Sequence, residues 1–88
     1  MIDQLKVKAQ SLKHAYGERR KYHVNKISEI RFKSKTDKSQ ELINELDEHK
    51  ECRRVCDKKW SIINNMLIGR TPLTTESIEQ LTREYMTS

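Results

Sequence analysis

Apolar residues recur in this chain at steps of three and four, the spacing of one face of an α-helix, and this regularity limits the fold more than any other feature. The second half carries the stricter stripe, whose steps alternate between four and three as in a heptad seam. Its members are Leu42, Leu46, His49, Arg53, Cys56, Trp60, Ile63 and Leu67. A stripe of this length predicts a helix over about residues 37–68 that packs against another helix.

A matching stripe in the first half predicts a helix over about residues 2–33. Its members are Ile2, Leu5, Ala9, Leu12, Tyr16, His23, Ile27 and Ile30, with Arg19 or Arg20 in the gap after Tyr16. No proline interrupts this stripe, but Gly17 lies inside it. Glycine costs about 1 kcal/mol in a helix interior. Gly17 therefore marks a kink, a close approach of another group, or an exposed position that tolerates it.

The second helix has predictable ends. Thr36 is the preferred N-cap, because its hydroxyl can accept a hydrogen bond from a free backbone N–H and Asp37 then suits the helix dipole. Two other hydroxyl residues of the same polar turn are alternative caps, Ser34 and Ser39. At the other end, Gly69 suits the position after the C-cap, and Pro72 prevents continuation.

A short third helix is expected over about residues 75–86. Thr74 is its expected N-cap, and Leu73 with Ile78 matches a hydrophobic staple. Two long helices joined by a short polar turn fold back on each other. A turn centred near residue 35 would place Trp60, Ile63 and Leu67 opposite the start of the first helix. The sequence thus predicts one all-α domain over residues 1–88: a long antiparallel helical hairpin, coiled-coil-like, with a short third C-terminal helix that returns over its open end, near Trp60.

The middle of the predicted hairpin is polar. Arg19 and His23 on the first helix are expected to face His49 and Arg53 on the second. Such a layer lowers stability but can fix the register of two helices. The leading interpretation of these four residues is therefore structural.

The composition indicates a thin core and a basic protein. Hydrophobic residues are 34% of the chain, charged residues are 35%, and the net charge is +5. The charge is uneven, since residues 1–38 hold eleven Lys/Arg and four Asp/Glu whereas residues 39–88 hold seven and nine. A basic surface is compatible with polyanion binding, and attraction between the two halves explains it equally well.

Nucleic acid is the leading predicted partner, because long cationic side chains meet phosphates and interleaved aromatics stack on unpaired bases. The expected contact residues are Lys6, Lys13, Arg20, Lys21, Tyr22, Lys26, Arg31, Phe32 and Lys33. The third helix carries a single base, Arg83, so reading of the major groove is not expected. The predicted function is that of a small basic accessory protein whose binding is nonspecific or directed to single strands.

The alternative is a protein-interaction module without nucleic-acid contact, either a homodimer or a docking subunit. Its basis is the set of apolar residues that lie off the main seam, namely Val7, Val24, Phe32, Val55 and Ile62. Self-association would then form a four-helix assembly.

Catalysis, metals, cofactors and membranes are not expected. A zinc site would need His49, Cys52, Cys56 and His23, whose spacing is not a usual zinc pattern. No phosphate-binding glycine-rich loop or hydrolase motif is present. Charges interrupt the N-terminal segment where a signal peptide would be apolar, no apolar run is long enough to span a membrane, and two cysteines are too few for a disulfide framework. We therefore expect a cytoplasmic protein with reduced thiols.

Overall fold

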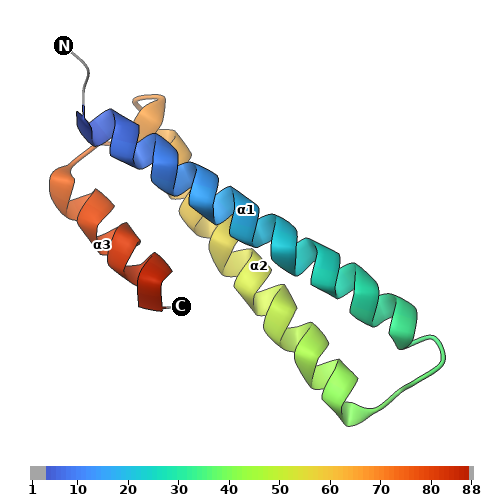
Figure 1. Cartoon of the computed structure of the whole chain (residues 1–88). Coiled ribbons are helices and arrows are strands. Elements are labelled where there is room, and N and C mark those ends of the chain that lie inside the picture. Colours follow the sequence, from blue (N-terminus) through green and yellow to red (C-terminus); the bar gives the residue numbers. More distant parts are fainter. Residues whose placement is uncertain (1–3, 88) are drawn as a thin grey trace.

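The computed structural model describes residues 4–87 and confirms the predicted architecture. Helix α1 spans Gln4–Lys33, α2 spans Gln40–Leu67 and α3 spans Thr75–Thr87. Figure 1 shows α1 and α2 side by side in opposite directions, with α3 beside the open end of the hairpin. The molecule measures 56 × 18 × 18 Å, the shape expected of a long hairpin two to three helices thick. The expected start of the first helix at residue 2 lies outside the described residues.

The predicted start of the second helix at residue 37 is wrong. Ser39 is the N-cap, and its hydroxyl accepts from the Leu42 N–H at 3.4 Å. The Thr36 hydroxyl instead donates to the Lys33 carbonyl at 3.3 Å, and the Asp37 carboxylate accepts from the Ser39 N–H at 3.1 Å. The Asp37 N–H also donates to the Lys33 carbonyl, at 3.0 Å, so residues 36 and 37 complete the end of α1 and do not begin α2.

This later start shifts the register of the hairpin. Because α2 begins at Gln40 rather than at residue 37, Trp60 faces a position further along α1 than predicted, although His49 faces His23 as expected. Trp60, expected opposite the beginning of the first helix, lies against Gly17. Trp60, also expected near the third helix, lines a depression that contains no residue of α3.

The other predicted helix ends are confirmed. Gly69 adopts a left-handed conformation with φ of 87° directly after the C-cap Ile68. The Gly69 N–H donates to Met66 and the Arg70 N–H donates to Asn65, at 3.4 and 2.9 Å, which is the Schellman pattern. The Thr74 hydroxyl caps α3 by accepting from the Ser77 N–H at 3.2 Å.

The core lies at the open end, where three helices meet. Its buried members are Ala9, Leu12, Tyr16, Cys56, Ile63, Met66, Ile78 and Leu81. Met66 lies outside the predicted seam and is buried because it joins the cluster that includes two α3 residues, Ile78 and Leu81. Toward the turn, the buried core is reduced to Ile27 and Ile30. Within residues 4–87, no polar or charged residue is fully buried.

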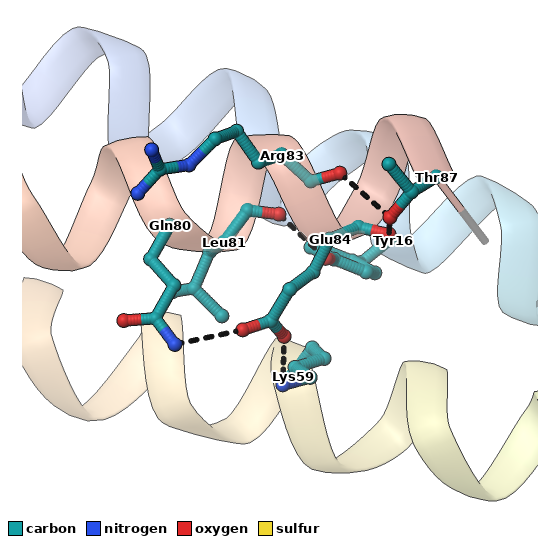
Figure 2. Close-up of polar contacts among 7 residues, drawn as sticks. All are labelled: Tyr16, Lys59, Gln80, Leu81, Arg83, Glu84 and Thr87. Atoms are coloured by element: carbon teal, nitrogen blue, oxygen red, sulfur yellow. Dashed lines mark hydrogen bonds and ion pairs between the residues drawn. The ribbon is translucent and has the colours of Figure 1, made fainter.

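Tyr16 joins α1 to α3. Its hydroxyl donates to the Leu81 carbonyl at 2.8 Å, and its ring meets Tyr85 edge to face with centroids 5.1 Å apart (Figure 2 draws the Tyr16 contact). Burial, together with the charge of Glu84, raises the pKa of the Tyr16 phenol to about 12, so this donor keeps its proton at physiological pH.

Ion pairing joins α3 to α2. Lys59 pairs with Glu84, which also accepts from the Gln80 amide at 3.1 Å (Figure 2). The hydrogen bond from Lys59 lowers the pKa of the Glu84 carboxyl. The third helix is therefore positioned by polar contacts to both long helices as well as by its apolar face.

The two glycines predict stability changes of opposite sign. Gly17 is helical, and a Cβ added there would meet Trp60 at 3.7 Å, which is ordinary van der Waals contact. Gly17→Ala should stabilise the fold by about 1 kcal/mol, or roughly 4–8 °C in Tm. Gly69→Ala should destabilise it by about 1 kcal/mol, because alanine is strained at φ of 87°. Thermal unfolding followed by circular dichroism measures both changes, and a destabilised Gly17→Ala protein would contradict the helical account of Gly17.

Candidate nucleic-acid interface

The hairpin has two grooves between α1 and α2, and α3 occupies only one of them. On the α3 side, Cys52 and Val55 of α2 line a depression together with Glu84 and Thr87 of α3. On the opposite side, a depression is lined by Lys13, Gly17 and Arg20 of α1 and by Asp57 and Trp60 of α2, with no residue of α3. We call this second side the open groove.

Basic residues recur along α1 and α2 at helical spacing from the residues that line the open groove. Lys6, Lys13 and Arg20 recur every seven residues, and Arg31 follows three turns after Arg20, so all four share one flank of α1. On α2, Lys50 and Arg53 precede Asp57 at helical spacing. We name these six residues the basic groove: Lys6, Lys13, Arg20, Arg31, Lys50 and Arg53.

Three of these cations have side-chain partners, two of them across the hairpin and one within α2. Lys13 donates to the Asn64 side-chain carbonyl at 3.0 Å. Arg20 forms an ion pair with Asp57, and Arg53 approaches the other oxygen of the same carboxylate at 3.8 Å. The single negative charge of Asp57 is therefore shared by Arg20 and Arg53, and these three groups together carry a net positive charge.

Trp60 lies at the centre of the open groove. Its ring is 36% exposed although Cys56 and Ile63, its seam neighbours, are 3% and 0% exposed. The Lys13 ammonium lies 4.7 Å from the centroid of the indole ring, a cation–π contact. Gly17 lacks the side chain that would cover the near edge of the ring, so the indole lies against the surface of α1.

The sequence interpretation missed Trp60 as a candidate site residue, because its heptad position indicated core. One signal was available in the sequence. Trp60 is the largest side chain of the second helix, and Gly17 is the only glycine of the first. That combination becomes visible only when the register is known, since the predicted register placed Trp60 opposite the start of the first helix.

The nine predicted contact residues do not form a single surface. Four belong to the basic groove, namely Lys6, Lys13, Arg20 and Arg31, and Lys21 lines its central depression. Tyr22 lines the groove on the α3 side, and the Lys26 ammonium lies 5.7 Å from the centroid of its ring. Phe32, which is 74% exposed, and Lys33 lie at the turn.

The polar layer is confirmed at one pair and corrected at the other. His23 and His49 face each other with their Nδ1 atoms 2.8 Å apart, within hydrogen-bonding distance, where one ring donates an N–H and the other accepts according to its tautomer. Arg19, expected to face Arg53, instead donates from Nη1 to the Tyr85 carbonyl at 2.8 Å, and its guanidinium stacks 3.6 Å from the centroid of the Tyr85 ring. The carbonyl and aromatic face of α3 attract this cation, whereas a second arginine would repel it.

The cysteines and histidines do not assemble into a recognisable metal centre. Cys52 is exposed and Cys56 is buried, and burial raises the pKa of the Cys56 thiol. Among residues 4–87, no group of three or more His, Cys, Asp or Glu side chains is arranged to hold a metal ion.

Comparison with protein-family models, with curated proteins and with solved structures found no match to this chain. No helix in the described part of the chain has the length and apolar character needed to cross a bilayer.

The histidine pair predicts loss of stability in mild acid. Burial, the facing His49 and the charge of Arg19 all lower the pKa of His23. The unfolded chain then binds a proton more readily than the folded one, so the free energy of unfolding decreases as the pH falls below about 6.5. Urea unfolding at neutral and mildly acidic pH should show a smaller decrease in His23→Gln than in the wild type. His14→Gln, at an exposed position on the same helix, is the matched control. An equal decrease in wild type and His23→Gln would contradict this account.

Proposed function

We propose that this protein is a non-catalytic nucleic-acid-binding protein that contacts phosphates through the basic groove. The observation that carries the proposal is that Lys13, Arg20 and Lys21 line the depression that α3 leaves open, where Asp57 and Glu18 are the acids. Lys6, Arg31, Lys50 and Arg53 extend this positive charge at helical spacing along the two helices. Such a row neutralises successive phosphates without reading bases, because the contacts are made by long cationic side chains.

The position of Arg20 supports this proposal. Its side chain is already ordered by Asp57, so less conformational entropy is lost when it contacts a phosphate. The Asp57 carboxylate limits the positive charge and keeps two arginines from repelling each other in the free protein. Binding is expected to be backbone-led, weakly specific and strongly dependent on salt.

The remaining predicted residues extend the same proposal. Lys21 lies on the rim of the central depression and pairs with Glu18 at 3.6 Å. Lys33 lies near the turn, where it extends the positive charge beyond Arg31. Tyr22 lines the depression on the α3 side, and the Lys26 ammonium lies next to its ring, so these two residues make a weaker candidate contact.

Self-association is a second candidate function. Val55 and Ile62 lie seven residues apart on α2 and are 39% and 37% exposed, so they share one solvent-facing flank. Pairing of this flank with that of a second copy would bury both residues and form a four-helix assembly. Sedimentation equilibrium tests self-association. A strict monomer at high protein concentration would contradict it.

We also propose a cytoplasmic location. Cys52 and Cys56 are both free thiols, which suits a reducing compartment.

Substitutions in the groove should change affinity in both directions. Fluorescence anisotropy with single- and double-stranded oligonucleotides at about 50 and about 200 mM salt measures the dissociation constant and its salt dependence. Lys13→Gln and Arg20→Gln should each weaken binding and reduce the salt slope by about 0.7 on a single strand or about 0.9 on a duplex. Asp57→Asn should tighten binding, because Arg20 and Arg53 lose the acid that they share.

The matched control is Lys58→Gln, an exposed lysine of α2 on the α3 side of the hairpin. It removes the same charge from the protein as Lys13→Gln but leaves the basic groove intact. Equal effects of Lys58→Gln and Lys13→Gln would show that only net charge matters. Absence of binding by the wild type at low salt would end the proposal.

A further inference from the structure

Trp60 is more exposed than its neighbours along the apolar seam. Its exposed fraction is 36%, whereas Cys56 and Ile63 are 3% and 0% exposed. The atoms nearest to Gly17 are Cδ1 and Nε1, so the pyrrole edge of the ring faces α1. Within residues 4–87, no acceptor receives the indole N–H in a hydrogen bond. The ring is thus a large aromatic surface in an open groove, with its polar edge unused.

Cations lie on both sides of this ring along α1. Lys13 is one turn before Gly17 and Arg20 is one turn after it, and both line the same depression as Trp60. The two cations are separated by about 10 Å along the helix axis, given the rise of 1.5 Å per residue. The depression therefore offers an aromatic surface between two positively charged groups.

From this arrangement we propose that Trp60 is a stacking platform for an unpaired nucleobase, with Lys13 and Arg20 holding the phosphates on either side of it. The inference rests on the proposed function and specifies its ligand as single-stranded nucleic acid. A duplex would satisfy the cations but not the ring, because its bases are already stacked on each other. A carboxylate-rich peptide would likewise leave the indole without a partner.

The position of Lys13 is compatible with stacking. In the free protein its ammonium lies over the indole, 4.7 Å from the ring centroid. A solvent-exposed cation–π contact is weaker than the stacking of a base on an aromatic ring, so a base can replace the ammonium. The displaced ammonium then lies next to the phosphate of the same strand, where it gains an ion pair.

The test uses two oligomers that carry the same phosphates but differ in bases. One is an oligothymidylate of about a dozen nucleotides, within the usual site size of single-strand binders, and the other is the abasic oligomer of equal length. Trp60 is the only tryptophan of the chain, so intrinsic fluorescence reports on this ring alone. The oligothymidylate should quench this fluorescence and the abasic oligomer should not.

Affinity measured by anisotropy with the labelled oligomers provides the second readout. The wild type should bind the oligothymidylate about 10-fold or more tightly than the abasic oligomer, as expected for one stacked base. Trp60→Leu should remove this difference without weakening the abasic complex. Trp60→Phe keeps an aromatic face and should retain most of the difference, so it tests the proposal even if the leucine variant fails to fold.

Each other outcome has a definite meaning. Equal binding of both oligomers without quenching overturns the stacking platform and leaves the phosphate-binding groove standing. Loss of the preference in Tyr22→Leu but not in Trp60→Leu also overturns it, because Tyr22 belongs to the groove on the α3 side. Absence of binding to either oligomer at low salt instead contradicts the proposed function itself.

Discussion

The packing of α1 against α2 along one apolar seam is the constraint on which the rest of the structure depends. Neither helix can bury its stripe alone, and the seam becomes a full core only where α3 adds Ile78 and Leu81. Stability is therefore concentrated at the open end, whereas the half near the turn is held mainly by Ile27 and Ile30. The third helix thus packs at the end of the hairpin that carries the larger buried core.

Between these two apolar regions the hairpin is joined by polar contacts. The His23–His49 pair and the Arg20–Asp57 ion pair connect α1 to α2 at positions where an apolar seam would slide more easily. The same contact that joins the helices at Asp57 orders a cation of the basic groove. Structural and candidate functional roles thus share one set of side chains, and a substitution at Arg20 is expected to affect both.

The side on which α3 packs decides which groove remains open. Tyr16, Arg19 and Lys59 each contact α3 and draw it to one side of the hairpin. On the other side, Lys13 and Arg20 line a depression together with Trp60 and without any residue of α3. A candidate polyanion site consequently arises from the placement of a short helix that itself carries a single basic residue, Arg83.

The sequence by itself determined the three helices, the antiparallel hairpin, the caps at Thr74 and Gly69, and the facing of His23 and His49, because periodicity and end signals are local. It also indicated Lys13 and Arg20 as members of one basic stripe. Only the tertiary structure decided the register and the separation of the two grooves. The start of α2 at Gln40 depended on how residues 36 and 37 satisfy the end of α1, and this shift placed Trp60 against Gly17. The contact of Arg19 with Tyr85 was likewise decided by the tertiary structure. Tyr85 lies 66 residues further along the chain, and no local pattern encodes such a contact.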